Sequence, residues 1–315
     1  MLVVTGGCGM IGSNLVRRLN SLGHRNIIIV DNLADGRKIQ NISDLQIDDY
    51  FDKSAFLSML SGQKDNDIQA VFHLGACSRT TEKDGRYVME NNYRYSVDLL
   101  KICQSGAIPL VYASSAGVYG NSGNFSELGG QEFPLTVYGF SKKLFDDRVR
   151  RLHMSHGIAQ VTGLRFFNVY GQGEQHKDGM TSPMLRFFTQ LSETGTATVF
   201  TQASVADARR DFVHVDDVVN VLIWAWQSKT SGIYNVGTGT QLSFEDVAHK
   251  VRQHLGFGEI VKRPFPQGMT AAYQRDTKAC RNRLFAAGYT GGFRTADAGI
   301  AEYMARLASA GGPTR

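Results

Sequence analysis

The first apolar run of the chain leads directly into a glycine-rich turn, in the stretch Leu2-Val3-Val4-Thr5-Gly6-Gly7-Cys8-Gly9-Met10-Ile11-Gly12. Gly6, Gly9 and Gly12 are three residues apart, and the residues that follow, 12–22, have the apolar spacing of a helix. Glycine at these places permits a tight turn, a close approach of the backbone to a pyrophosphate, and close packing of helix on strand. The stretch therefore predicts a strand, a phosphate-binding turn and a helix whose free N–H groups point at the anion.

Short apolar runs alternate with helix-length segments through the first half of the chain. We expect strands at 2–5, 26–30, 70–73, 109–113 and 160–166, and helices at 12–22 and 93–104. This alternation is typical of a doubly wound parallel sheet in an α/β fold. Beyond residue 170 the pattern is less regular, with helices expected at 183–193 and 244–255, which indicates a second, smaller domain. Strand-like runs at 210–215 and 232–236 could return to the main sheet.

Composition and charge narrow the class of protein. The 315 residues are 42% hydrophobic and 20% charged, which is typical of a globular protein. The net charge of +5 comes from scattered basic residues, so no nucleic-acid partner is expected. The four cysteines have neither CxxC nor zinc-ligand spacing, so neither a disulfide framework nor a metal site is expected. Without a leader-like start or an apolar run of about 20 residues, the chain is expected to be cytoplasmic and not to bind membranes.

The second predicted strand ends at Asp31-Asn32, about 20 residues after the glycine turn, where a carboxylate can hold an adenosine ribose. Asp31 favours NAD, because its charge repels a 2′-phosphate. Arg37 and Lys38 follow in the same loop, however, and either could neutralise that phosphate while Asn32 donates hydrogen bonds. These residues therefore do not decide whether the cofactor is NADP or NAD.

A serine, a tyrosine and a lysine form a candidate catalytic group. Tyr138 and Lys142 are four residues apart, hence on one face if the segment is helical. A nearby cation favours the phenolate and should lower the pKa of the tyrosine from its usual value of about 10. The predicted strand 109–113 ends at Ser114-Ser115, at the carboxyl edge of the sheet, where ligands of such folds bind.

In this order the three residues resemble the catalytic residues of the extended short-chain dehydrogenase/reductases, the family of nucleotide-sugar epimerases and dehydratases. Segments 165–171 and 210–217 are similar to that family as well. The resemblance implies that Ser115 hydrogen-bonds the reacting hydroxyl and that Tyr138 removes its proton. It implies that Lys142 binds the nicotinamide ribose and tunes the tyrosine.

The resemblance also implies the fold and its division. The fold is a doubly wound parallel sheet of the Rossmann type with a smaller α/β substrate domain. Residues 1–169 and 211–239 would form the NADP-binding domain, and residues 170–210 and 240–315 the substrate-binding domain. Sugar dehydratases of the family carry an Asp-Glu pair just after the catalytic serine or threonine. Here Ala116-Gly117 stands at that place, which leaves epimerases, reductases and simple dehydrogenases.

Several loops are similar to those of the ADP-L-glycero-D-manno-heptose 6-epimerases, namely 31–33, 48–50 with Lys53, 75–85, 91–93 and Tyr273-Gln274. The resemblance implies an NADP-dependent enzyme, with NAD as the alternative. The enzyme would invert C6″ of an ADP-heptose by transient oxidation to a ketone and return of the same hydride. It would be a homo-oligomer, a pentamer in that family, and would act in carbohydrate metabolism such as lipopolysaccharide synthesis.

Inversion requires a second acid/base on the opposite face of the carbon, because one phenol cannot serve both faces without a large reorientation. Lys177 matches the lysine that does this in the resembling enzymes. Burial beside a cationic ring would lower the pKa of Lys177 and make it a usable base.

The resemblance assigns the remaining binding residues. The cofactor set is Gly6, Gly9, Met10, Ile11, Gly12, Asp31, Asn32, Lys38, Lys53, Leu74, Gly75, Ala76, Ser78, Asn91, Lys142, Val169 and Lys177. The substrate set is Ser115, Asn168, Gly179, Arg186, Phe200, Arg210 and Tyr273. Within it, Arg210 pairs with the diphosphate or instead with Asp211 or Asp216. Phe200 packs on the adenine or in a core.

Four features depart from the resembling enzymes. Gly179 stands in place of a serine, Arg186 in place of a histidine and Leu74 in place of a glutamate, and the loop 202–208 is slightly longer. Three alternatives stay open: a related NDP-sugar epimerase that acts at another carbon such as C4, an NDP-sugar reductase, and a non-catalytic NADPH-binding regulator.

Overall fold

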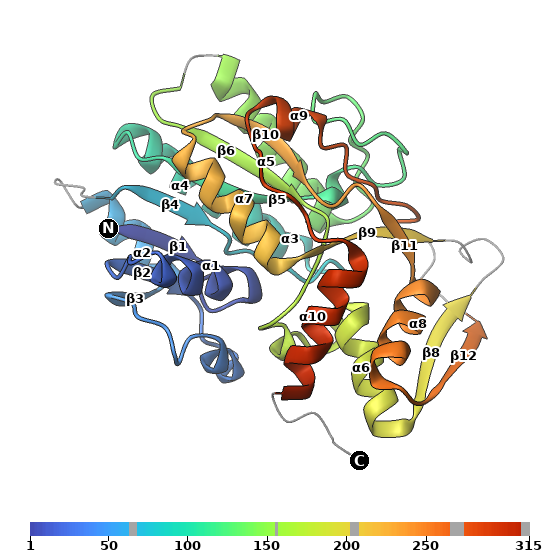
Figure 1. Cartoon of the computed structure of the whole chain (residues 1–315). Helices are drawn as coiled ribbons and strands as arrows, with labels where there is room; N and C mark the ends of the chain where they lie inside the picture. The colour runs from blue at the N-terminus through green and yellow to red at the C-terminus, as the bar shows by residue number, and fades with distance from the viewer. Residues whose placement is uncertain (63–67, 155–156, 202–207, 265–273, 310–315) are drawn as a thin grey trace.

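A seven-stranded parallel sheet forms the centre of the larger lobe (Figure 1). The computed structural model describes residues 1–62, 68–154, 157–201, 208–264 and 274–309. The strands lie in the order β10-β6-β5-β4-β1-β2-β3. Their bounds are β1 (Leu2–Thr5), β2 (Ile27–Asp31), β3 (Asp49–Asp52), β4 (Ala70–His73), β5 (Leu110–Ser115), β6 (Val161–Phe166) and β10 (Gly232–Val236). The predicted doubly wound sheet is confirmed, with the predicted strands displaced by two residues at most.

Helices cover both faces of this sheet. One face carries α1 (Met10–Ser21), α7 (Val215–Gln227) and α9 (Asn282–Ala286), and the other carries α2 (Lys53–Gly62), α4 (Tyr95–Ser105) and α5 (Val137–Met154). Successive strand side chains point to opposite faces, so Leu2 and Val4 pack toward α1 and α7, whereas Val3 packs toward α2 and α4. Burial on both faces explains why the strands appear as unbroken apolar runs.

The helical stretch after β4 contains one turn of wider, π-helical geometry. It consists of α3 (Gly85–Met89), a π-helical turn η2 (Glu90–Arg94) and α4. The prediction of a helix at 93–104 is confirmed, but the π turn was not predicted. Such turns occur often at functional sites, and this one carries Asn91 and Asn92.

The smaller lobe has its own sheets and core. Its three-stranded sheet has the order β11 (Gln241–Ser243), β9 (Arg209–His214) and β7 (Asn168–Tyr170), and its two-stranded sheet joins β8 (Thr196–Thr201) to β12 (Glu259–Pro264). Helices α6 (Pro183–Thr194), α8 (Phe244–Leu255) and α10 (Ala296–Ser309) pack around the apolar core. The helices predicted at 183–193 and 244–255 are confirmed by α6 and α8.

The expectation that residues 210–215 return to the main sheet is wrong. The run 210–215 forms β9, which pairs with β7 and β11. The run 232–236 forms β10, which does join the main sheet, beside β6. The apolar pattern of both runs specifies a buried strand, but it does not specify the partner. β10 occupies the position next to β6, so β9 forms a separate sheet.

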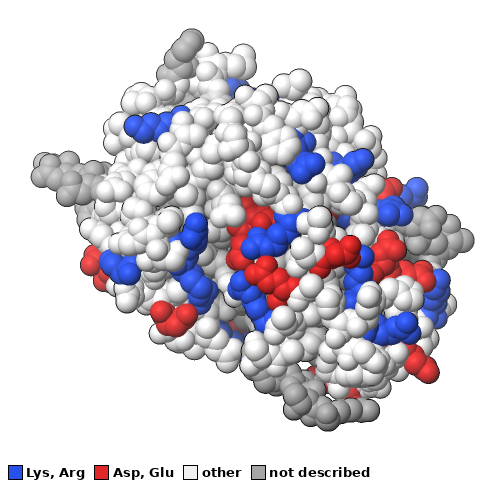
Figure 2. Space-filling view, in the orientation of Figure 1, with Lys and Arg blue, Asp and Glu red and all other residues white. Residues whose placement is uncertain are grey.

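Charges of both signs are interspersed near the middle of the face in Figure 2, around the region where α7 and α10 begin. Arg294 pairs with Asp217 at the start of α7 and, over 2.9 Å, with Glu302 of α10. Arg306 pairs with the same Glu302 over 2.7 Å. This network ties α10 of the smaller lobe to α7 of the larger one.

Within the described ranges, no helix is both long and apolar enough to cross a membrane.

Candidate functional site

The glycine turn packs too closely to accept side chains. A Cβ on Gly12 would overlap the carbonyl oxygen of Gly6 and lie 2.7 Å from the Cα of Gly7. Gly6 has a φ of +69°, and a Cβ there would lie 2.7 Å from the backbone nitrogen of Gly75. Helix α1 begins at this turn and has no acidic residue in its first turn, so its own side chains do not oppose an anion at its N-terminus. The cradle fits the pyrophosphate of a dinucleotide.

A cavity of about 600 Å³ extends from this turn along the carboxyl edge of the sheet. All of the predicted cofactor residues except Lys142 and Val169 line it. Arg37, which the sequence offered as an alternative to Lys38, lines the cavity too. Further lining residues were not predicted as ligands: Thr5, Val30, Ala34, Asp35, Cys77, Arg79, Glu82, Tyr87, Tyr95, His176, Asp178 and Met180. The predicted set therefore gathers in one place, although its members come from segments up to 170 residues apart in the chain.

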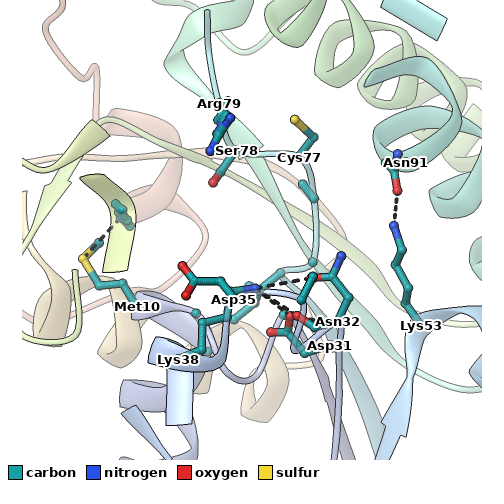
Figure 3. Close-up of a pocket in the computed structure, with 18 of the residues that line it drawn as sticks. Met10, Asp31, Asn32, Asp35, Lys38, Lys53, Cys77, Ser78, Arg79 and Asn91 are labelled. Atoms are coloured by element: carbon teal, nitrogen blue, oxygen red, sulfur yellow. Dashed lines mark hydrogen bonds and ion pairs between the residues drawn. The ribbon is translucent and has the colours of Figure 1, made fainter. Parts of the chain in front are cut away.

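At the lower end of the cavity in Figure 3, the carboxylate of Asp31 is fully engaged. It accepts hydrogen bonds from the backbone N–H of Cys8 over 2.9 Å and of Asn32 over 2.7 Å. The amine of Lys38 donates to it over 2.9 Å. Lys38 therefore neutralises the charge of Asp31, which removes much of the repulsion that a 2′-phosphate would otherwise meet.

Arg37 binds protein carboxylates, so it is not poised for a phosphate as the sequence allowed. Its guanidinium pairs with Asp35 over 2.8 Å and with Asp178 over 2.6 Å. The hydrogen bonds from Arg37 lower the pKa of Asp35 to about 2 and also lower the pKa of Asp178. Of the two cations in this loop, Lys38 is the one that adjoins the candidate ribose site.

The opposite wall of the cavity includes the loop after β4, Lys53 of α2 and Asn91 of the π turn. Lys53 donates to the side chain of Asn91, and Figure 3 shows the two pointing toward each other from separate elements. Asn92 accepts from the backbone N–H of Cys77 over 2.7 Å and donates to its carbonyl over 3.1 Å. This pair of bonds fixes the loop that begins at Gly75, so that Cys77, Ser78 and Arg79 line the cavity.

Tyr138 and Ser115 lie side by side. A Cβ on Gly117 would lie 3.3 Å from the Ser115 hydroxyl, which is tight, and 3.8 Å from the Tyr138 ring, which is an ordinary contact, so Gly117 borders both side chains. The Ser115 hydroxyl accepts a hydrogen bond from the backbone N–H of Gly117 over 3.0 Å. Lys142, one turn along α5 from Tyr138, donates to the carbonyl of Ala113 over 2.8 Å.

The predicted direction of the tyrosine pKa is wrong for this arrangement. Burial raises the pKa of Tyr138, and hydrogen bonding with Ser115 only partly offsets that effect. Burial also lowers the pKa of Lys142 to about 8, which weakens it as a source of positive charge for the phenol.

The cofactor cavity adjoins the Ser-Tyr-Lys group through Cys77. Cys77 lines the cavity and lies close enough to Tyr138 and Lys142 that a thiolate there would raise the pKa of both groups. Burial raises the pKa of Cys77, so the thiol form dominates near neutral pH. The three candidate catalytic residues are thus at the border of the cavity and not in its lining.

Lys177 reaches the cavity from the smaller lobe, on the turn η4 (Gln175–Met180). Its amine lies 3.5 Å from the Sδ of Met10, at the start of α1. Burial lowers the pKa of Lys177, and the charge of Glu174 opposes that shift. Glu174 itself accepts from Ser182 over 2.5 and 2.6 Å and from Tyr303 over 3.0 Å, which holds the beginning of the turn.

The predicted substrate residues are less concentrated. Asn168 lies in β7, with its Oδ1 3.5 Å from the hydroxyl of Thr277, and Gly179 is exposed in η4. Arg186 lies on α6 over the ring of Phe187, with 5.1 Å between Cζ and the ring centroid. Phe200 is 40% exposed in β8.

Arg210 has a structural task. Its guanidinium donates to the backbone carbonyls of Gln274 and Arg275 and holds that segment near β9. The amide of Gln274 in turn donates to the carbonyl of Gly120 over 2.8 Å, near the end of β5. Tyr273 lies outside the described residues.

One cluster in the described part of the chain has the residue types of a metal site. Ligand atoms of His214, Asp216 and Glu302 lie within 4.8 Å of one another. Arg294 and Arg306 pair with both carboxylates, so the negative charge that would attract a cation is already offset. The cluster is better explained as part of the network between α7 and α10.

The chain matches a known family over most of its length. Residues 2–237 match the model described as the NAD dependent epimerase/dehydratase family. The chain belongs to this family. As a member of the NAD dependent epimerase/dehydratase family, it is an enzyme of the nucleotide-sugar epimerase and dehydratase type that uses a nicotinamide cofactor.

Solved structures of several family members are similar to this one. The Helicobacter pylori ADP-L-glycero-D-manno-heptose-6-epimerase is 27% identical, with a TM-score of 0.85 over 98% of this chain and 96% of that one. The UDP-N-acetylglucosamine 4-epimerase of Methanobrevibacter ruminantium, in complex with UDP-N-acetylmuramic acid, is 20% identical, with a TM-score of 0.84 over 98% of both chains. MoeE5, in complex with UDP-glucose and NAD, is 24% identical, with a TM-score of 0.78 over 98% of this chain and 99% of that one. At these lower identities the last two show likeness of fold alone.

Proposed function

We propose that this enzyme is an NADP-dependent epimerase of an ADP-heptose that inverts C6″. The observation that carries the proposal is that two candidate proton-transfer groups approach one cavity from different lobes: Lys177 lines the cavity, and Tyr138 lies at its border. Tyr138 comes from α5 of the larger lobe, beside Cys77, and Lys177 comes from η4, beside Met10. An enzyme that removes and returns a hydrogen on opposite faces of one carbon needs such a pair.

The residues have distinct tasks in this mechanism. A bound nicotinamide cofactor supplies the acceptor and the donor of the hydride. Ser115 holds the reacting hydroxyl against Tyr138, and the phenol exchanges the proton of that hydroxyl. Lys142, fixed to Ala113, orients the ribose and the phenol. Lys177 exchanges a proton on the other face, for which its lowered pKa suits it because a larger share of the amine is neutral near pH 7.

The preference for NADP is supported by the pairing of Lys38 with Asp31. A lysine that already neutralises the carboxylate can turn toward a 2′-phosphate while Asn32 donates to it. In this proposal, residues 1–169 and 211–239 bind the cofactor and residues 170–210 and 240–315 bind the sugar nucleotide. Cytoplasmic location and assembly into a homo-oligomer stay predictions.

The assignment of an ADP-heptose as the substrate is supported by the loops that resemble those of the heptose 6-epimerases and by the 27% identity to the Helicobacter pylori enzyme. A second candidate is an NDP-sugar epimerase that acts at another carbon, such as C4. The departure at Gly179 favours it, because the resembling enzymes bind their substrate with a serine at this position and glycine has no hydroxyl to do so. The sugar half of the pocket is therefore the part in which the two candidates differ.

Substitution of the two proposed proton-transfer groups tests the mechanism. Tyr138→Phe and Lys177→Met should each lower kcat for ADP-heptose epimerisation by about 10²-fold or more, with NADP binding nearly unchanged. Lys143→Met is the matched control, since Lys143 is next to Lys142 on α5 but pairs with Asp147 over 2.7 Å. Full activity of Tyr138→Phe would refute the catalytic assignment, and an equal loss of NADP binding by Lys177→Met would make that lysine a cofactor ligand instead.

A further inference from the structure

We propose that the ion pair between Arg37 and Asp178 is a positioning device that holds Lys177 in the cavity. Asp178 follows Lys177 directly in the chain, whereas Arg37 belongs to η1 (Gly36–Asn41), the turn that follows β2 in the other lobe. Both residues line the same cavity as Lys177. Arg37 and Asp178 would then affect the reaction through Lys177, without touching the reacting atoms. The activity part of the inference rests on the proposed function.

The geometry of the pair fixes direction as well as distance. Arg37 donates from both terminal nitrogens to the two carboxylate oxygens of Asp178, over 2.6 and 2.9 Å. One of these nitrogens also donates to the carbonyl of His176 over 3.2 Å. The opposite side of the guanidinium is held by Asp35, which accepts from Nε over 2.9 Å. A planar guanidinium clamped in this way defines the place and orientation of the residues on both sides of Lys177, namely His176 and Asp178.

The backbone of Asp178 is in a conformation that needs support. Its φ of 48° and ψ of −128° lie outside the regions that L-residues prefer. Within the described ranges, only Ala107, Asp178 and Lys229 combine a side chain with positive φ. Such strain persists where surrounding contacts hold the residue, and it is concentrated at functional sites. The clamp by Arg37 is the side-chain contact that supplies this support.

The backbone N–H of Lys177 donates to the carbonyl of Glu174 over 3.0 Å, but the contact of its side-chain amine would not fix that amine. Its amine lies 3.5 Å from the Sδ of Met10, and a thioether is a weak acceptor. The start of the turn is tied separately, because Asn41 of η1 donates to the carbonyls of Gly173 over 3.1 Å and Cys8 over 3.0 Å. Asn41 therefore holds the chain before Lys177 and Arg37 holds it after, and both come from η1.

Chemical labelling of Lys177 tests the inference without any substrate. The protein is treated with N-hydroxysuccinimide acetate, and acetylation of each lysine is followed by peptide mass spectrometry. Asp178→Asn should raise the labelling rate of Lys177 by about fivefold, with the exposed Lys101 as internal reference. Asp178→Gly, which removes the carboxylate and relieves the backbone strain, should raise the labelling rate of Lys177 as well. This variant replaces Asp178→Asn in the experiment if the asparagine variant folds poorly. Asp44→Asn is the matched control, because it breaks an exposed pair with Arg17 away from the cavity, and it should leave the rate unchanged.

A double-mutant cycle assigns the effect to the pair. Arg37→Gln alone should raise the labelling of Lys177 about as much as Asp178→Asn, and the double variant should not exceed either single variant. With the substrate of the proposed function, Asp178→Asn should lower kcat about tenfold and leave KM within about twofold, because the proton-transfer group is displaced while the binding surface stays.

Failure of the positioning role and failure of the proposed function give different results. Labelling of Lys177 at the wild-type rate in Asp178→Asn and Asp178→Gly overturns the positioning role, whatever the activity. An equal rise in Asp44→Asn overturns it too, because the effect would then be general loosening. If labelling behaves as expected but the wild-type enzyme leaves every nucleotide sugar unchanged, the proposed function fails and the positioning of Lys177 stands.

Discussion

The side-chain amine of Lys142 donates a hydrogen bond to the backbone carbonyl of Ala113 over 2.8 Å, which joins helix α5 to the end of strand β5. One turn further along α5, Asp146 accepts from Tyr112 and Ser114 of the same strand, each over 2.9 Å. These three bonds fix the helix that carries Tyr138 against the strand that carries Ser115.

The first prediction concerns the buried arginine that supports this junction. Arg165 is fully buried and pairs with Asp146 over 2.8 Å and with Glu132 over 2.6 Å. Arg165→Met should lower the free energy of unfolding by about 3–5 kcal/mol, because it leaves the buried Asp146 without its cation and leaves the buried Glu132 paired with Arg150 alone. Arg17→Met, which breaks an exposed pair, should cost at most about 1 kcal/mol in the same urea titration. Equal losses of unfolding free energy in the two variants would mean that the buried ion pairs of Arg165 stabilise the protein no more than the exposed pair of Arg17 does.

The second prediction concerns the glycine turn. Gly12→Ala should abolish measurable NADP binding and destabilise the protein by about 1–3 kcal/mol, because the new methyl group overlaps the Gly6 carbonyl. Gly292→Ala is the control, since no heavy atom lies within 4 Å of a Cβ there. Isothermal titration with NADP measures the first effect. Normal binding by Gly12→Ala would contradict the role of the turn.

The sequence predicted the sheet and the glycine turn because each depends on local spacing, and the resemblance to the family supplied the set of cofactor residues. Gly12 and Asp31 can be found from their distance to neighbouring strands. The clamp between Arg37 and Asp178 could not, because it joins charges 141 residues apart and no periodic pattern marks it. In the sequence, only the charged residues next to Lys177 pointed to an ion pair at this turn.

The same limit explains the two errors. The strand pattern of β9 did not reveal its partners, since pairing is decided by the tertiary arrangement. The pKa of Tyr138 was expected to fall because of its spacing to Lys142, but spacing contains no information on burial, and burial sets the direction.

The third prediction concerns the choice of cofactor. Lys38→Met should weaken NADP binding by about 10- to 100-fold and change NAD binding by less than about threefold, because the lost charge would face a 2′-phosphate and would leave Asp31 unneutralised. Lys101→Met, at an exposed pair with Asp98, should change neither. Fluorescence titration with both cofactors measures the two constants. An equal loss for NAD and NADP would contradict the preference for NADP.

The fourth prediction concerns acid stability. His73 is buried between the hydroxyls of Thr5 and Ser96, and burial, together with the charge of Lys142, lowers its pKa to about 3. In the unfolded chain the pKa is about 6.5, so the unfolded state binds the proton first as the pH falls. The folded state therefore loses stability from about pH 6.5 down to about pH 3, by about 3 kcal/mol at pH 4.

His73→Gln should remove this part of the acid sensitivity. The difference between the unfolding free energies at pH 7 and pH 4 should shrink by about 3 kcal/mol relative to the wild type. His249→Gln, at a half-exposed histidine, should leave the difference nearly unchanged. If His73→Gln has the same acid dependence as the wild type, His73 does not stay neutral in the folded protein.

The central claim is that the enzyme inverts one carbon of an ADP-heptose without net oxidation. The most direct measurement is proton NMR of ADP-heptose incubated with the enzyme and NADP, with the absorbance of NADPH recorded in the same sample. We predict a product of equal mass in which C6″ alone is inverted, and no net change in NADPH. Inversion at another carbon such as C4, stoichiometric formation of NADPH from NADP, or an unchanged sugar would contradict it.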